Sequence, residues 1–179
     1  EKSYAKVGED EVQYAGPALT DEAGEAKIAV FGPKADEAVQ SSEIRALVAE
    51  LNRNGRKLSL VAIPTQAAWG KASTQLVDSI YRDHVVGMIA MDRASSNLAE
   101  QLAVRAFVPV IAVSSDKTLT SINIPWIFRL PADSSLEQAL RCFGDAMNKA
   151  GVNRERVRDV LASGSEVAGV RFASTGEPK

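Results

Sequence analysis

The sequence is poor in the residues that build metal centres and disulfide frameworks. Its 179 residues include one cysteine, Cys142, and one histidine, His84. A single cysteine allows no internal disulfide, and a single histidine excludes a histidine-rich metal site. We therefore expect neither a metal nor a cofactor to hold this fold together.

Long apolar runs and strong charge of one sign are also missing. The longest apolar stretches, such as residues 85–91 and 108–113, are too short for a transmembrane helix. The formal net charge is −2 and no basic stripe is present, which argues against a nucleic-acid partner. With 45% hydrophobic and 25% charged residues, the composition is that of an ordinary globular protein, and the length suits one compact domain.

Negative charge gathers at the beginning of the chain. Residues 1–26 hold seven acids and two bases, a local charge of −5. Because this stretch is polar and aperiodic, we interpret residues 1–26 as an N-terminal arm. Two alternatives stay open: Tyr4, Val12 and Tyr14 dock on the domain, or the arm is a loose leader. The chain starts at Glu1 without a methionine, so we expect a processed or trimmed form.

From residue 27 onward, short apolar runs alternate with helical periodicity. Between the runs, apolar residues recur at helical spacing, as at Ile44, Leu47 and Leu51. Strands that alternate with helices through short connections predict a parallel sheet covered on both faces, an α/β fold. The predicted strands are residues 27–31, 57–63, 85–91, 109–113 and 125–130.

Capping residues predict where several helices begin. Ser95, Ser96 and Asn97 are good caps for the helix after the third strand. In the last third, Ser134 or Ser135 caps a helix that Gly151 ends, and Asn153 caps another. A short final strand is expected over residues 169–173.

No motif typical of an enzyme is present. The sequence lacks the glycine-rich dinucleotide and triphosphate loops and the Gly-x-Ser-x-Gly elbow. We interpret His84 as a surface residue at the entry to a strand and Cys142 as a packed core thiol. The acid pair Asp36 and Glu37 is expected in a solvated loop. These residues give no catalytic constellation, so we expect a protein that is not an enzyme.

Three stretches carry a resemblance to one protein family: residues 28–33, 86–133 and 150–172, with residues 68–73 in addition. In their order along the chain, over about residues 27–176, they resemble type I periplasmic binding proteins, in the branched-chain amino-acid receptor branch of ABC transport. The resemblance implies a periplasmic or extracytoplasmic location and an ABC permease as partner.

The chain departs from this family in one large respect. Family members have two α/β lobes joined by three crossing segments. Here a single helix, residues 134–149, separates the segments that in the family enter and leave the second lobe. The resemblance therefore implies a complete first lobe over residues 27–176 with no second lobe. We expect a three-layer α/β/α sandwich with a flavodoxin-like sheet in strand order 2-1-3-4-5.

The resemblance also implies a ligand site at the carboxyl ends of the strands. In the family, hydroxyls and N–H groups there grip a ligand carboxylate, and a helix N-terminus offers free N–H groups and partial positive charge. Asp92 would repel a carboxylate or receive an ammonium, and Arg93 would add charge or fill the site. The matching residues are Trp69, Asp92, Arg93, Ser95, Ser96, Ser114 and Ser115.

Three hypotheses of function follow. The first is a one-lobe module that binds a small amino-acid-like solute, weakly or as a homodimer that covers the open edge. The second is a scaffold or sensor lobe that binds another protein. The third is an enzyme, which would need His84, Cys142 or an acid pair at the same edge. Serines that converge on an open polar pocket favour the first, and a flat or filled edge favours the second.

Overall fold

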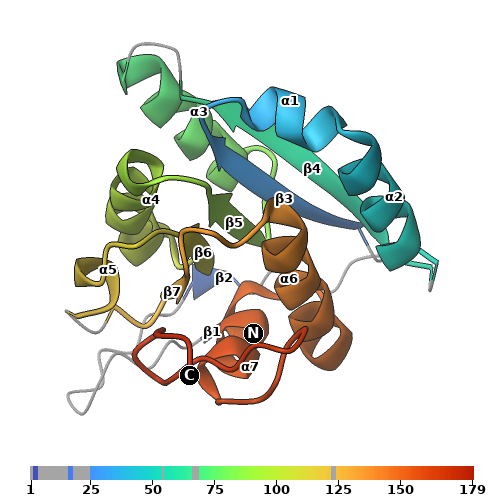
Figure 1. Ribbon diagram of the computed structural model, residues 1–179, viewed down its shortest axis with the longest axis vertical. Helices are drawn as coiled ribbons and strands as arrows, with labels where there is room; N and C mark the ends of the chain where they lie inside the picture. Colours follow the sequence, from blue (N-terminus) through green and yellow to red (C-terminus); the bar gives the residue numbers. More distant parts are fainter. Residues whose placement is uncertain (1, 4–15, 18–24, 54, 66–68, 122–123) are drawn as a thin grey trace.

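A five-stranded parallel sheet forms the centre of the computed structural model, which describes residues 2–3, 16–17, 25–53, 55–65, 69–121 and 124–179 (Figure 1). The strand order is β4-β3-β5-β6-β7, which confirms the predicted order 2-1-3-4-5. The strands are β3 (Glu25–Gly32), β4 (Lys57–Pro64), β5 (Gly87–Ala90), β6 (Val110–Val113) and β7 (Ile127–Leu130). Within the predicted arm, β1 (Lys2–Ser3) pairs with β2 (Gly16–Pro17), but Glu25 and Ala26 already belong to β3; Tyr4, Val12 and Tyr14 lie outside the described residues.

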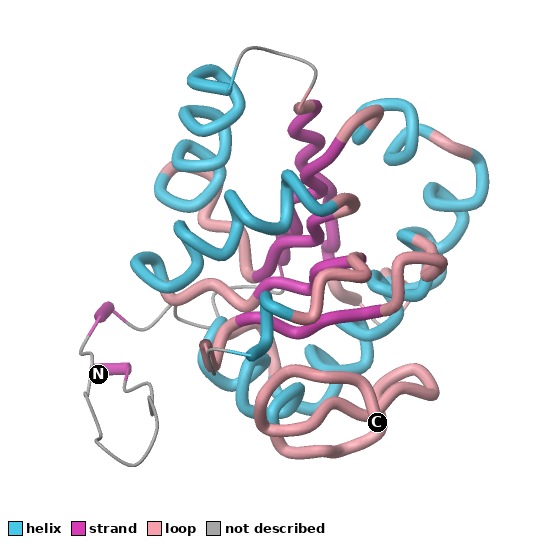
Figure 2. Tube along the Cα trace, turned by 60° about the vertical axis from the view of Figure 1, so that its left-hand side comes forward, coloured by secondary structure: helices cyan, strands magenta, loops and turns pink. Residues whose placement is uncertain are grey.

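Helices cover both faces of the sheet, giving three layers (Figure 2). One apolar cluster lies under α2 (Ser42–Leu51), α6 (Leu136–Ala150) and α7 (Arg154–Ala162). The other lies under α3 (Trp69–Tyr81) and α4 (Arg93–Ala106). Two short helices were not predicted, α1 (Ala35–Gln40) and α5 (Thr118–Ser121). None of the helices in the described ranges is long and apolar enough to cross a membrane.

Burial on both faces explains the apolar strands. Along β3, Ile28 and Val30 belong to one cluster, whereas Ala29 and Phe31 belong to the other. Successive side chains point to opposite faces, so a strand covered on both sides needs apolar residues at every position. Arg129 in β7 departs from this pattern, because it is a buried charge in a strand that is buried at every position.

The predicted caps of the last two long helices are confirmed. The Ser135 hydroxyl accepts a hydrogen bond from the Gln138 N–H at 3.1 Å, which decides between Ser134 and Ser135. The Asn153 side chain accepts one from the Arg156 N–H at 3.1 Å. Gly151 follows α6 with a φ of 77°, a conformation that favours glycine.

The predicted start of α4 is wrong. The helix begins at Arg93, and the Asp92 carboxylate caps it by accepting the Ser95 N–H at 2.8 Å. Ser95 and Ser96 therefore lie inside the first turn. Aspartate and serine cap helices about equally well, so the sequence alone did not distinguish them. The acid pair was also misplaced: Asp36 and Glu37 lie in the first turn of α1, where negative charge is favoured.

The predicted final strand over residues 169–173 is also wrong. Residues 167–178, all of which the structure describes, form only two isolated bridges, between Val167 and Val170 and between Phe172 and Pro178. The segment is a C-terminal loop held to β7, where the Arg129 N–H donates to the Gly176 carbonyl at 2.8 Å.

Gly176 is required at this contact. It has a φ of +87°, and a Cβ there would lie 1.9 Å from the Ile127 carbonyl oxygen. The loop therefore lies directly against the backbone of β7 and covers that edge of the sheet.

Cys142 is a packed core thiol, as predicted, and we expect it to be unreactive in the folded protein. It has no exposed surface, its Sγ lies 3.6 Å from the Val167 carbonyl oxygen, and burial raises the pKa of the thiol to about 12. Because only the thiolate attacks disulfide reagents, Ellman's reagent at pH 8 should label no thiol until denaturant is added. One thiol labelled rapidly in native buffer would contradict this packing.

Candidate functional site

A pocket of about 310 Å³ lies at the carboxyl ends of the strands. This is the edge at which open α/β sheets bind ligands. Its volume is at the small end of the range of about 300–1,000 Å³ for ligand pockets. Apolar and polar side chains line it together: Phe31, Thr65, Ala72, Asp92, Ala94, Ser95 and Leu98.

The Ser95 hydroxyl is the unusual group in this pocket. Ser95 is 1% exposed, and its Oγ has no hydrogen-bond partner among the described residues. Buried hydroxyls are nearly always paired, because an unpaired one costs about 1–3 kcal/mol of desolvation. A buried, unpaired hydroxyl beside a cavity is therefore a group that a ligand atom can satisfy.

Asp92 places negative charge in the same pocket. One of its carboxylate oxygens accepts the Ser95 N–H, which leaves the other oxygen available to a cation. The N–H groups of Arg93 and Ala94, in the open first turn of α4, have no partner among the described residues. The pocket thus offers N–H and O–H donors and a carboxylate within one turn of chain.

Ser96 is not part of this pocket. Its hydroxyl donates to the Asp92 carbonyl oxygen at 2.6 Å, so it is buried and already paired. It lies in the first turn of α4. Of these two adjacent serines, the structure therefore places Ser95, and not Ser96, against this pocket.

Ser114 lies at the end of β6, in a loop that is closed by its own hydrogen bonds. The Ser114 hydroxyl accepts the Asp116 N–H at 3.1 Å, and the Asp116 carboxylate accepts the Thr118 N–H at 3.0 Å. Arg93 reaches this loop from α4, with its Nε 2.9 Å from the Asp116 carboxylate. The bonds from Thr118, together with Arg93, lower the pKa of Asp116. Arg93 thus ties the start of α4 to the loop after β6, with 74% of its side chain exposed.

Arg129 and Glu177 fill the neighbouring space at the end of β7. The Arg129 Nε and Nη2 lie 2.8 and 2.5 Å from the two Glu177 oxygens, and its Nη1 donates to the Ser114 carbonyl at 3.0 Å. Thr120 also donates to Glu177. The hydrogen bonds from Arg129 lower the pKa of Glu177 to about 2. This end of the sheet already binds a carboxylate, and that carboxylate belongs to the chain itself.

The remaining candidates lie apart from the pocket. Ser115 is exposed and does not line it. Trp69 begins α3, and its side chain lies outside what the structure describes. His84 is exposed before β5, at the opposite edge of the sheet, with a φ of 52°. The four serines therefore do not converge on one open pocket.

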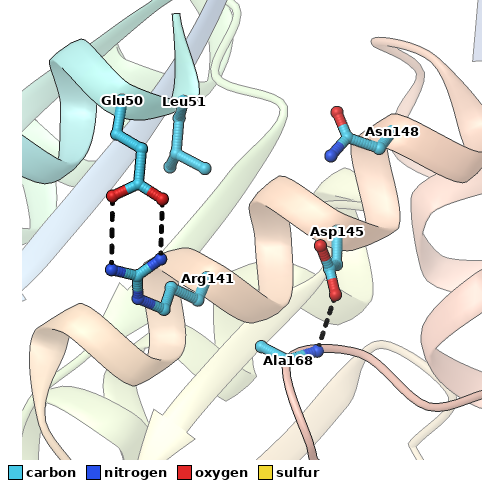
Figure 3. A pocket seen from close by; sticks show the side chains of 6 residues that line it. All are labelled: Glu50, Leu51, Arg141, Asp145, Asn148 and Ala168. Carbon is cyan, nitrogen blue, oxygen red and sulfur yellow. Dashed lines mark hydrogen bonds and ion pairs between the residues drawn. The ribbon is translucent and has the colours of Figure 1, made fainter.

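A second pocket, of about 350 Å³, lies between α2, α6 and the C-terminal loop (Figure 3). Its polar groups are already paired. Arg141 bridges to Glu50 at 3.2 Å, Asp145 accepts the Ala168 N–H at 2.8 Å, and the Asn148 side chain accepts from Arg56 at 2.9 Å. Because each of these polar side chains already has a partner, this pocket is a weaker candidate. In the described part of the chain, no three His, Cys, Asp or Glu residues group as metal ligands.

Comparisons with known proteins give likeness in fold. No protein-family model matches the chain, and a search of curated proteins also found no match. An ABC transporter substrate-binding protein from Desulfitobacterium hafniense superposes with a TM-score of 0.52 at 22% identity, over 71% of this chain and 39% of that chain. An ABC transporter substrate-binding protein from the same organism, in complex with Leu, gives 0.50 and 22%, over 70% of this chain and 38% of that one.

A further match is the branched-chain amino acid transporter substrate-binding protein LivJ from Streptococcus pneumoniae, in complex with isoleucine. Its TM-score is 0.49 at 16% identity, over 59% of this chain and 33% of that chain. This chain thus spans between a third and two fifths of the length of these three structures. With the sheet order above, the two Desulfitobacterium hafniense structures show that the chain has the α/β fold of ABC transporter substrate-binding proteins, over part of their length.

Proposed function

We propose that the chain is a non-catalytic solute-binding lobe that takes a small amino-acid-like ligand in the Ser95 pocket. One observation supports this most strongly: the buried, unpaired Ser95 hydroxyl beside a cavity at the carboxyl edge of the sheet. The fold is that of substrate-binding proteins, one of which was solved in complex with Leu.

The chemistry of the pocket suits a zwitterion. The Ser95 hydroxyl and the Ala94 N–H would donate to the ligand carboxylate at the positive end of α4. The free Asp92 oxygen would accept from the ligand ammonium. Phe31 and Leu98 form an apolar wall for the ligand side chain.

A single lobe should bind such a ligand weakly. Two-lobed proteins close over a ligand and bury most of its surface, whereas one lobe supplies part of those contacts. We expect a Kd of about 1 mM, about −4 kcal/mol. A second copy that covers the carboxyl edge would raise the affinity and make the protein's mass depend on ligand. An extracytoplasmic location and an ABC permease as partner belong to the same proposal.

Leucine should stabilise the protein through the Ser95 pocket. At 10 mM ligand and a Kd of about 1 mM, linkage predicts about 1.4 kcal/mol, or about 4 °C in Tm. Leucinamide lacks the carboxylate and 4-methylpentanoate lacks the ammonium, so each should shift Tm by less than half as much. Differential scanning fluorimetry with a panel of amino acids measures these shifts.

Variants assign the effect to the pocket. Ser95→Ala removes a hydroxyl that has no partner in the described residues, so stability should change by less than about 0.5 kcal/mol. Its ligand affinity should fall about threefold to tenfold, the value of one hydrogen bond. Ser115→Ala, at an exposed site outside the pocket, is the control and should bind as the unmodified chain does. Equal binding by both variants would contradict the assignment.

The second candidate is a scaffold or sensor lobe that binds another protein. The carboxyl end of β7 favours this second hypothesis, because the Glu177 carboxylate already pairs with Arg129 there. A protein whose Tm is unchanged by every amino acid in the panel would support the scaffold hypothesis over solute binding.

A further inference from the structure

The two outermost strands of the sheet, β4 and β7, differ in how their outer sides are covered. The C-terminal loop lies on β7, through the bond between the Arg129 N–H and the Gly176 carbonyl. The edge strand β4 pairs only with β3, and no strand in the described residues pairs with its outer side. An uncovered edge offers a row of unpaired N–H and C=O groups to another strand.

Hydrogen bonds identify which residues of β4 face outward. The Asn52 side-chain amide bonds both the backbone N–H and the C=O of Leu58, at 2.7 and 3.1 Å. The backbone groups of Leu58 therefore point away from β3. Backbone groups alternate in direction along a strand, so the N–H and C=O groups of Leu60 and Ala62 point outward as well. Thr65 fits this alternation, since its N–H bonds Gly32 of β3 at 3.2 Å.

The outward groups at the centre of β4 are unprotected. Across the described ranges, no backbone or side-chain group bonds the outward N–H and C=O of Leu60 or Ala62. Asn52 covers only the first outward position. Charged residues and proline normally guard such edges, yet residues 58–63 contain neither, with Lys57 and Pro64 at the ends.

We propose that β4 pairs with β4 of a second copy of this chain, antiparallel, about a two-fold axis at Val61. In that register Leu60 lies opposite the partner's Ala62, and Ala62 opposite the partner's Leu60. Both are outward-facing residues, so each pair exchanges two backbone hydrogen bonds.

The same register brings no like charges together. Lys57 lies opposite the partner's Thr65, and Val61 meets the partner's Val61 in a pair without backbone hydrogen bonds. The outward groups of Leu60 and Ala62 are thus complementary to those of a second copy, as a two-fold interface requires. This self-complementarity is why a second copy, and not an unrelated peptide, is the proposed occupant.

This dimer is independent of ligand. Because the paired strands run in opposite directions, the carboxyl edges of the two protomers point opposite ways. Each Ser95 pocket stays open in this dimer. An experiment can therefore contradict the pairing of β4 without contradicting solute binding, and the reverse. A mass that rises only with ligand would instead indicate contact through the carboxyl edge.

A disulfide at the two-fold axis tests the register. Directly opposed residues without backbone hydrogen bonds lie about 4.5 Å apart between Cα atoms, within disulfide range. Val61→Cys should therefore cross-link under mild oxidation at least tenfold faster than Thr74→Cys, an exposed site on α3. Cys142 is buried and should not compete. Equal cross-linking rates for the two variants would overturn the proposal.

Charge at the same position gives a second test that needs no oxidation. Light scattering of the unmodified chain should report about twice 19.1 kDa at about 100 µM, with or without leucine. Val61→Lys and Val61→Glu should each be monomeric alone and dimeric when mixed, because like charges repel and opposite charges pair across strands. A monomeric unmodified chain, or two dimeric single variants, would overturn the proposal.

Discussion

Replacing Glu177 by glutamine is expected to lower the free energy of unfolding by about 2 kcal/mol at pH 7. Arg129 is buried and bonds both Glu177 oxygens, so the variant leaves a buried guanidinium without its counter-charge. The full effect of the pKa shift would be larger, but the Glu177 side chain is 32% exposed and water screens the pair. Urea unfolding measures the difference.

The same pair predicts how stability depends on pH. The pKa of Glu177 is about 2 in the folded chain, below its usual value near 4.3 in an unfolded one. Its contribution is therefore complete above about pH 5 and is lost as the pH falls towards 2. The unfolding free energies of the unmodified chain and Glu177→Gln should converge over that range.

A matched control separates this pair from general charge effects. Glu166 pairs with Arg171 at 3.3 Å, with both side chains about 60% exposed. Glu166→Gln should change stability by less than about 0.5 kcal/mol at any pH. If Glu177→Gln behaves like Glu166→Gln, the C-terminal loop is not held by its ion pair.

Replacing Phe143 by alanine is expected to cost about 3–5 kcal/mol. Phe143 is fully buried, and its ring packs from α6 onto the backbone of β5 at Gly87. A Cβ at Gly87 would lie 2.5 Å from the ring, closer than real contacts allow. Gly87→Ala alone should therefore cost about 1–3 kcal/mol through overpacking.

The double variant tests whether the two residues share one space. With the ring removed, the alanine methyl at position 87 no longer clashes and fills part of the cavity. Gly87→Ala with Phe143→Ala should be more stable than the sum of the single effects predicts, by at least about 1 kcal/mol. Gly144→Ala with Phe143→Ala is a comparison pair, because a Cβ at Gly144 meets Leu51 instead. Additive effects for Gly87 and Phe143 would contradict the packing.

The sequence was sufficient for the sheet because burial on both faces leaves a continuous apolar signal. Each of β5, β6 and β7 is buried at every position, and the helices between them repeat at 3.6 residues. The C-terminal loop has no such continuous apolar pattern. Residues 169–173 look like a strand, but Gly169 and Gly176 take left-handed conformations, and the loop depends on contacts with β7.

The site was predicted only in part, because hydroxyl groups serve several structural roles. Ser95 and Ser96 are adjacent and equally buried, yet one hydroxyl is unpaired and the other bonds the Asp92 carbonyl. Local sequence does not distinguish them. Arg129 had a signal, a lone charge in an apolar run, but its partner Glu177 lies 48 positions away. Thr65 and Phe31 reach the pocket only because β3 and β4 are neighbours.

The most direct test of the solute-binding account is an NMR titration of the ¹⁵N-labelled chain with leucine. The account predicts amide shifts that saturate together with a Kd of about 1 mM and cluster at Thr65 and at Asp92 to Ser95, around the pocket. Amides of α7, which does not line it, should not move. An unchanged spectrum at 20 mM leucine and with the full amino-acid panel, or shifts spread evenly over the surface, would contradict the account.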